Sequence, residues 1–339
     1  MLRMGIEEDN IEIISSIREN AKKLLSEDQV DLVIGYSEGT VPLSSTPVII
    51  RKAEDVDKLT WNNLCYMNLA RYLAPLMPQL CDREGNALRI GIVAKGCVAR
   101  AINLLAVEKQ VDLKKITMIG FNCNGIVNRS KIDLEIGEKE ILEVVVSGDD
   151  IIVKGRDWEK KFPYDQYINE LCKVCKVKTP STTEENCIGE CKELESVHDE
   201  FSDIDDFEAK SAEEKWDYIK NILEVCTLCY SCRQACPACY CNLCFVDQNK
   251  PIWFGKTTEY RDIFTFHLIR ATHLAGRCVA CGACASVCPV GIDLNFITRK
   301  LEKIVKERFD YTSGLDAETL PPMMDFDMKD AQEFMLEED

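Results

Sequence analysis

The sequence predicts an α/β (α+β) N-terminal domain followed by a cysteine-rich domain embedded in helices. Residues 89–110 have the pattern of a strand, a tight turn and a helix, and residues 115–121 have that of the next strand. Such a β-α-β unit pairs its strands in parallel, because the crossover helix returns the chain to the same edge. The cysteine-rich part lies between Cys226 and Cys288, where one cysteine pattern occurs twice.

Composition limits what the chain can be. Its 339 residues are enough for two or three domains. The net charge of −17 argues against nucleic acid, which asks for a basic protein face. No run approaches the roughly 20 apolar residues of a membrane span, and the N-terminus lacks the apolar core of a signal peptide. We therefore expect a cytoplasmic protein whose nineteen cysteines are metal ligands rather than disulfide partners.

Both copies of the cysteine pattern have the form C-x2-C-x2-C-x3-C-P. This is the bacterial spacing for [4Fe–4S] clusters, in which the fourth cysteine of each run holds the other cluster. The spacing therefore predicts a bacterial-type 2[4Fe–4S] ferredoxin domain. The alternative is a pair of structural zinc sites, which typically use two separated C-x2-C pairs. The predicted ligands are Cys226, Cys229, Cys232 and Cys288 for cluster 1, and Cys278, Cys281, Cys284 and Cys236 for cluster 2.

The remaining elements of the N-terminal domain, residues 1–192, follow from hydrophobic periodicity. Apolar residues recur at helical spacing near the start of the chain, and two short β-branched runs flank a Gly/Ser/Thr/Pro loop. The predicted elements are helices over 8–26, 54–77 and 160–175, strands over 31–36 and 46–52, and a hairpin over 140–155 that turns at Ser147–Asp150.

The C-terminal half begins with an acidic stretch, residues 193–214, in which ten of 22 positions are Asp or Glu. We interpret this stretch as a solvated linker, with a surface that meets a basic partner as the alternative. The dicluster domain then covers residues 215–309 and contains an insertion, 245–277, between the runs. Helices are predicted over 215–225, 262–276 and 291–309, and His267 and His273 are interpreted as packing or hydrogen-bonding residues. An acidic tail, 310–339, is expected to be disordered alone or to dock on a partner.

Four further cysteines predict a third site. Cys97 follows one strand of the β-α-β unit and Cys123 follows the next strand. Both fall at the carboxyl ends of neighbouring parallel strands, where α/β sheets bind ligands. Cys172 and Cys175 form a C-x2-C pair that can close over them, so four thiolates would meet around a third [4Fe–4S] cluster. An alternative of equal weight is that Cys97 and Cys123 are small buried apolar side chains, as free cysteine often is.

A dense group of thiols follows the first run. Cys239, Cys241 and Cys244 come within eight positions after Cys236. Thiolates at this density predict a further metal site that needs one outside ligand. The candidates for that ligand are Cys65, Cys187 and Cys191. The alternative is a cysteine-rich loop that only shields the first cluster.

The turn at Lys95, Gly96 and Arg100 lies between a predicted strand and a predicted helix. Glycine allows close backbone approach, a helix N-terminus favours an anion, and the two cations add positive charge. The turn can therefore hold the phosphate of a flavin or a nucleotide. A G-x-G-x-x-G pattern is absent, so a Rossmann dinucleotide site is not predicted. The alternative is a plain turn that presents Cys97.

Four segments of the N-terminal domain carry a resemblance to a known family: 95–105 (KGCVARAINLL), 119–127 (IGFNCNGIV), 144–155 (VVVSGDDIIVKG) and 172–175 (CKVC). With these segments, residues 29–190 resemble the beta subunits of coenzyme-dependent hydrogenases and formate dehydrogenases, whose archaeal members reduce a deazaflavin coenzyme. The resemblance implies that the positions of Cys97, Cys123, Cys172 and Cys175 form a cluster site beside a bound FAD. Residues 226–295 resemble a dicluster ferredoxin module, and the composite resembles iron–sulfur subunits that accompany heterodisulfide-reductase-like flavoproteins.

These features predict an iron–sulfur electron-transfer subunit of a cytoplasmic anaerobic complex of formate dehydrogenase, hydrogenase or heterodisulfide reductase type. It would pass single electrons between a partner catalytic subunit and a flavoprotein or carrier. A second hypothesis is an FAD-containing dehydrogenase subunit that itself reacts with a deazaflavin or nicotinamide coenzyme. A third is a zinc-binding scaffold. The expected partners are other redox subunits, and no catalytic side chain is predicted.

Overall fold

The computed structural model describes residues 8–41, 43–76, 88–148, 150–180 and 199–326. The strands are β1 (Leu32–Glu38), β2 (Ser45–Ile50), β3 (Ile90–Ala94), β4 (Ile116–Gly120), β5 (Glu143–Ser147), β6 (Asp150–Lys154) and β7 (Glu159–Pro163). The α-helices are α1 (Glu8–Ser26), α2 (Leu73–Leu76), α3 (Gly96–Val107), α4 (Arg129–Ile136), α5 (Tyr164–Tyr167), α6 (Glu170–Lys173), α7 (Asp205–Glu208), α8 (Ala212–Glu224), α9 (Ser231–Ala235), α10 (Tyr260–His273), α11 (Ala283–Ser286) and α12 (Asn295–Phe309). The 3-10 helices are η1 (Ala53–Lys58), η2 (Leu69–Tyr72), η3 (Leu113–Lys115), η4 (Ser202–Ile204) and η5 (Pro322–Met324).

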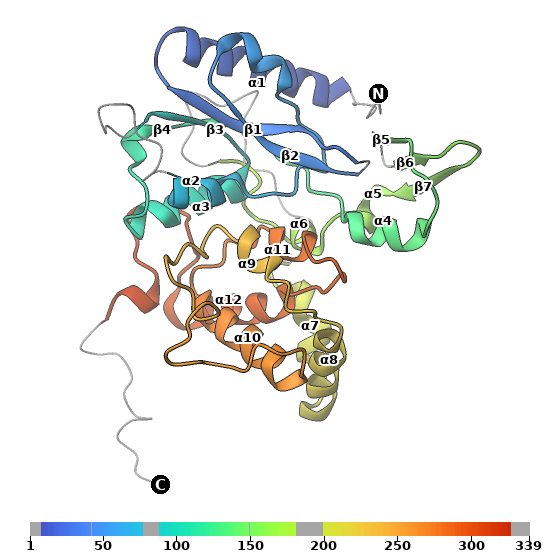
Figure 1. Ribbon diagram of the computed structural model, residues 1–339, viewed down its shortest axis with the longest axis vertical. Helices are drawn as coiled ribbons and strands as arrows, with labels where there is room; N and C mark the ends of the chain where they lie inside the picture. Colours follow the sequence, from blue (N-terminus) through green and yellow to red (C-terminus); the bar gives the residue numbers. More distant parts are fainter. Residues whose placement is uncertain (1–7, 42, 77–87, 149, 181–198, 327–339) are drawn as a thin grey trace.

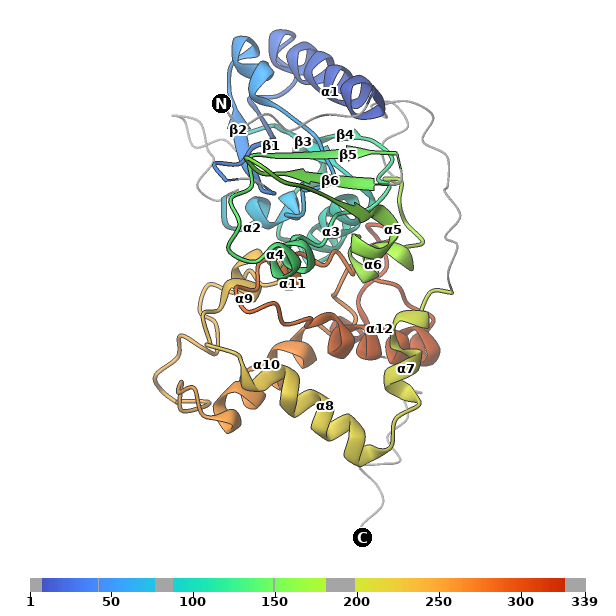
Figure 2. The ribbon, with the colours of Figure 1, turned by 90° about the vertical axis from the view of Figure 1, so that its right-hand side faces the viewer.

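The molecule has two halves, a sheet half within residues 8–180 and a helical half within residues 199–309 (Figure 1). The sheet half contains a four-stranded sheet of order β2-β1-β3-β4. Helix α1 covers one face of this sheet, and α2 and α3 cover the face that points toward the helical half (Figure 2). In the part of the chain that the structure describes, no helix is long and apolar enough to cross a membrane.

The predicted β-α-β unit is confirmed. Strands β3 and β4 pair in parallel, with Ile90 opposite Ile116 and Ala94 opposite Gly120, and α3 forms the crossover. Strand β1 also pairs in parallel with β3, whereas β2 is an antiparallel edge strand. All five residues of β3 are buried, as expected for a strand covered on both faces.

The predicted hairpin is also confirmed, and it belongs to a second, three-stranded sheet of order β5-β6-β7. Strand β7 was not predicted, and the helix predicted over 160–175 is wrong in its first part. There Phe162 is buried between exposed neighbours, which is the alternation of a strand. The helical remainder is broken into α5 and α6, because the Asn169 side chain accepts a hydrogen bond from the Leu171 backbone N–H and starts a new helix.

The helix predicted over 54–77 is mostly wrong. Only η1, η2 and α2 are helical there, and the chain between them is irregular. Asparagine side chains explain the break. Asn62 Oδ1 accepts from the Leu64 backbone N–H at 2.9 Å, and Asn68 Oδ1 accepts from the Ala70 N–H at 3.1 Å. Such local bonds compete with the helical ladder, and apolar periodicity does not reveal them.

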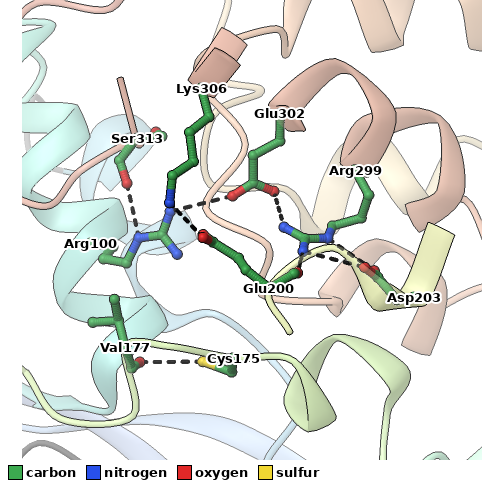
Figure 3. A network of polar contacts seen from close by, with 9 residues as sticks. All are labelled: Arg100, Cys175, Val177, Glu200, Asp203, Arg299, Glu302, Lys306 and Ser313. Atoms are coloured by element: carbon green, nitrogen blue, oxygen red, sulfur yellow. Dashed lines mark hydrogen bonds and ion pairs between the residues drawn. The ribbon is translucent and has the colours of Figure 1, made fainter. Parts of the chain in front are cut away.

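Residues 199–214, which we call the acidic segment, fall within the stretch interpreted as a solvated linker; residues 211–214 are exposed, whereas the first part of the segment packs on the protein. This segment contains η4 and α7 and packs along the basic helix α12 (Figure 3). Arg299 donates to Asp203 at 2.9 Å, and Lys306 lies 2.5 Å from Glu200. The basic partner of the acidic residues is therefore a helix of the same chain. Residues 193–198 lie outside the described part.

The first part of the predicted tail docks on helix α3. Arg100 Nε donates to the Ser313 carbonyl at 2.9 Å, and Asn103 Nδ2 donates to the Gly314 carbonyl at 3.1 Å. Gly314 has a φ of 71°, and a Cβ there would lie 2.0 Å from the Arg100 carbonyl oxygen. The tail thus ties the helical half to the sheet half. Residues 327–339 lie outside the described part.

Candidate metal centres

The two cysteine runs share a backbone conformation that suits an anionic cluster. In each run the residue before and the residue after the second cysteine have a left-handed φ, with 51° at Leu228 and 61° at Tyr230, and 50° at Ala280 and 69° at Gly282. Alternation of this kind turns successive N–H groups toward one point, as in the backbone nests of iron–sulfur sites. The short helices α9 and α11 then begin at equivalent positions.

The first run is joined by the last cysteine of the second. Burial raises the pKa of the Cys226 thiol, the Leu228 N–H lowers it, and the charges of Cys288 and Cys229 raise it further. The Leu228 N–H lies 3.4 Å from Cys226 Sγ, and the Ile292 N–H lies 3.3 Å from Cys288 Sγ. The structure therefore brings Cys288 to the first run, as the exchanged ligand pattern requires. The ligand assignment itself stays a prediction.

Cys236 lies with the second run in the same way. A hydrogen bond from Cys239 lowers the pKa of Cys236 to about 6 against the opposing effect of burial, and Arg270 contributes to the same lowering. Burial raises the pKa of Cys281 to about 12, and the charges of Cys97 and Cys236 raise it too. Cys284 also has Cys236 among its charged neighbours. Both exchanged cysteines thus lie beside the opposite run.

Cys97, Cys123, Cys172 and Cys175 all line one small cavity in the sheet half. Cys97 is the second residue of α3, and Cys123 follows β4 by three residues. The C-x2-C pair comes from α6 and the loop after it, which the Asn169 N–H ties to the Ile126 carbonyl at 2.7 Å. The structure therefore brings together the four cysteines predicted for the third site.

Burial and the neighbouring thiols disfavour ionisation of the cysteines in this cavity. Burial raises the pKa of Cys97 to about 12, Lys95 opposes this, and the charges of Cys123, Cys175 and Cys172 raise it further. Burial likewise raises the pKa of Cys172 to about 12. Four adjacent thiols cannot all ionise without compensation, and binding a metal supplies that compensation while releasing the protons.

The cavity also borders the second run. Cys281 and Ala280 line it together with the four thiols. The third site and the predicted cluster 2 are therefore next to each other, although Cys97 and Cys281 are far apart in the sequence.

Lys95, Gly96 and Arg100 each have an internal contact. Lys95 is buried, donates from Nζ to the Cys65 carbonyl at 2.6 Å and lies 5.7 Å from the Trp61 ring centroid. Arg100 donates to the tail and lies 3.8 Å from Glu302. A Cβ at Gly96 would lie 2.1 Å from the Val177 carbonyl oxygen, so this glycine lets the chain after Cys175 cross the start of α3. The flavin-phosphate hypothesis stays a prediction.

Cys239, Cys241 and Cys244 line a separate cavity of about 660 Å³ beside α10. Cys65 is not brought to them, because it lies buried in the sheet half with its thiol 3.7 Å from Asn62 Oδ1. Cys187 and Cys191 lie outside the described residues. Among the described residues, no three His, Cys, Asp or Glu side chains are placed to hold a single metal ion. The further metal site stays a prediction.

Two side chains of α10 belong to the environment of the runs. His267 is buried with Nε2 3.4 Å from Cys226 Sγ, in keeping with the hydrogen-bonding role expected for it. Arg270 was not singled out by the sequence. It donates from Nη2 to the Cys232 carbonyl at 3.3 Å, and its Nε is buried without a hydrogen-bond partner in the described chain. The three-residue spacing puts both side chains on one helix face and was the signal available in the sequence.

The residues present fit iron–sulfur clusters. None of the sixteen cysteines that the structure describes is in a disulfide. Soft thiolates are the ligands of such clusters. The Leu228 and Ile292 backbone N–H groups lie 3.4 Å and 3.3 Å from the sulfurs of Cys226 and Cys288, and so supply donors to two of these thiols.

Comparison with known proteins agrees with the sequence resemblance. The 4Fe-4S binding domain family matches residues 272–292. The chain is 23% identical to the F420-dependent formate dehydrogenase subunit beta of Methanocaldococcus jannaschii, over 90% of this chain and 93% of that protein. It is 24% identical to the F420-dependent formate dehydrogenase 1 subunit beta of Methanococcus maripaludis, over 89% and 91%. Among solved structures, the F420-reducing [NiFe] hydrogenase complex from Methanosarcina barkeri matches 51% of this chain and 65% of that chain, with a TM-score of 0.39 and 16% identity. The predicted resemblance to formate dehydrogenase beta subunits is confirmed.

Proposed function

We propose that this chain is an iron–sulfur electron-transfer subunit of a cytoplasmic oxidoreductase complex of the formate dehydrogenase type. It would relay single electrons between a partner catalytic subunit and a flavoprotein or carrier. In this proposal the sheet half is a beta-subunit-like domain with one cluster, and the helical half is a two-cluster ferredoxin domain. When bound, [4Fe–4S] clusters supply one-electron chemistry at potentials that the surrounding protein sets.

The observation that carries the proposal is the continuity of the three thiol groups. Cys281 belongs to the second predicted ligand set and also lines the cavity of the third. Cys284 of the second set is a charged neighbour of Cys232 in the first set. The cysteines would therefore hold three centres in a series that runs from the sheet half into the helical half, which is what a relay requires.

The cysteines and their neighbours have separate tasks in this series. The thiolates would hold the clusters, and the nests of N–H groups would stabilise the negative charge of the bound sulfur atoms. The third set is partly buried, and the pKa values of its Cys97 and Cys172 thiols are strongly raised. The hydrogen bonds that Arg100 and Asn103 donate to the tail would hold the two halves together.

Similarity supports the assignment to a formate dehydrogenase type of complex. The relatives named above are subunits of F420-dependent formate dehydrogenases, and the similarity covers about nine-tenths of the chain. Their names also favour the second hypothesis, an FAD-containing subunit that itself reacts with the deazaflavin coenzyme. Flavin analysis after anaerobic purification distinguishes the two hypotheses. A chain that binds no flavin, and whose centres do not accept electrons from the reduced deazaflavin coenzyme, only relays electrons.

Removing one thiol of the third set tests the relay. Cys97→Ala and Cys172→Ala should each lower the iron content by about four per chain, because each breaks one [4Fe–4S] site. Cys65→Ala is the matched control, since this thiol is buried in the same half but outside the cavity. Equal iron content in all three variants and the unchanged protein would refute the third centre. In the assembled complex, formate should reduce the clusters of the unchanged chain, and persistent oxidation would refute the relay.

A further inference from the structure

Helix α10 lies in the insertion between the two cysteine runs and approaches both of them. His267 and Arg270 lie one turn apart on it, and both are buried. The sequence between two ferredoxin-type runs need only close a loop, so a buried histidine and a buried arginine on its helix call for an explanation.

Arg270 faces cysteines of both predicted clusters. Only 4% of it is exposed. Its guanidinium bonds the Cys232 carbonyl of the first set and is a charged neighbour of Cys284 and Cys236 of the second set. Arg270 also lowers the pKa of the Cys284 thiol against the larger opposing effect of burial. The group therefore lies between the two predicted ligand sets rather than beside one of them.

No carboxylate within the described residues forms an ion pair with Arg270. Its neighbours differ in this respect, because Arg233 lies 2.7 Å from Asp247 and Arg277 pairs with Glu108. A buried guanidinium without an anion is costly, and Nε of Arg270 is itself buried without a hydrogen-bond partner in the described chain. The anionic groups that can compensate this charge are the cysteine thiolates and what they hold.

We propose that Arg270 is the residue that raises the reduction potentials of both ferredoxin-type clusters, and that Nε donates to a cluster sulfur. The proposal rests on the proposed function. A reduced cluster carries one more negative charge than an oxidised one, so a fixed buried cation stabilises the reduced form more. Net charge and hydrogen bonds to sulfur are the protein's means of setting such potentials. His267 Nε2 lies 3.4 Å from Cys226 Sγ of the first set, so this side chain would act on cluster 1 only.

The test is a redox titration of the complete chain followed by EPR. Arg270→Gln removes the charge and keeps a hydrogen-bonding side chain. At a fixed potential the ratio of reduced to oxidised protein should fall at least about tenfold at both centres, which for a one-electron couple is a shift of about 59 mV to lower potential. Arg261→Gln, at an exposed position of the same helix, is the matched control and should leave both potentials unchanged.

Each result decides the proposal. Full iron content with unchanged potentials in Arg270→Gln would overturn it. If that variant loses iron, the proposal is tested on the unchanged protein labelled with 15N-arginine. Pulsed EPR should then detect a guanidinium nitrogen coupled to a reduced cluster. Absence of this coupling overturns the proposal. His267→Phe should move one potential only. Failure of the proposed function is distinguishable, since the unchanged protein would then lack two reducible iron–sulfur centres altogether.

Discussion

Replacing Arg299 with methionine tests how the acidic segment is held on helix α12. Arg299 donates to Asp203 at 2.9 Å and to Glu302 at 2.6 Å (Figure 3). The side chains of the three residues are only 3%, 9% and 8% exposed. The substitution keeps an apolar side chain in place but leaves two carboxylates without their guanidinium.

The magnitude follows from this burial. Breaking a buried pair by removing one partner costs about 3–5 kcal/mol, because an uncompensated charge remains. Glu302 keeps a second cation, since Arg100 lies 3.8 Å away, whereas the Asp203 carboxylate has no other cation within ion-pair distance among the described residues. We therefore expect the lower end, about 3 kcal/mol. If the chain of 339 residues unfolds as one unit, this lowers the thermal midpoint by no more than roughly 6–12 °C.

Anaerobic circular dichroism with limited proteolysis of the acidic segment measures both effects. Cleavage between residues 199 and 214 should become much faster in Arg299→Met than in the unchanged protein. Lys303→Met is the control, because Lys303 pairs with Glu208 at the partly exposed edge of the same contact and should matter less. Equal midpoints and cleavage rates for Arg299→Met and Lys303→Met would refute the reasoning.

Two further predictions concern the sheet half. Gly96→Ala places a Cβ within 2.1 Å of the Val177 carbonyl oxygen. The substitution should therefore displace the chain after Cys175 and lower the iron content, measured by iron analysis, by about four per chain. Full iron content would show that the crossing of the two segments tolerates a methyl group. Asp31 has a pKa lowered mainly by the hydrogen bond from Arg89, so the unfolded state binds the proton more readily. The stability from this pair is present above the ordinary pKa of Asp31, 3.8, and is lost as pH falls through the lowered pKa. Asp31→Asn should flatten this acid dependence in urea unfolding, and an identical dependence would contradict the assignment.

The elements that periodicity predicted correctly are those stabilised by their own apolar pattern. Strand β3 is a continuous apolar run that is buried throughout, helix α3 is mostly apolar, and β6 of the β5-β6 hairpin alternates between buried and partly buried residues. The irregular chain before η2 was missed because its structure depends on single asparagine side chains, which compete with the helix locally. Strand β7 was missed because its only buried side chain is Phe162, too little for a pattern.

Tertiary partners account for what composition misjudged. Ten acidic residues in 22 suggested solvation, yet Asp203 and Glu200 contact basic residues about a hundred positions later in α12. Such pairing is invisible in a local window. The four cysteines predicted for the third site line one cavity, and the proximity of Cys97 and Cys123 follows from the order of the parallel strands. The burial of Arg270 between the two runs was not, since it depends on how α10 packs.

The most direct test of the account is the iron and sulfide content of the complete chain after anaerobic purification. The account predicts about twelve irons and twelve sulfides per chain, four of each for every predicted centre. Zinc in place of iron would contradict the iron–sulfur assignment outright. About eight irons would contradict the third centre, and with it the series of thiol groups that joins the two halves of the molecule.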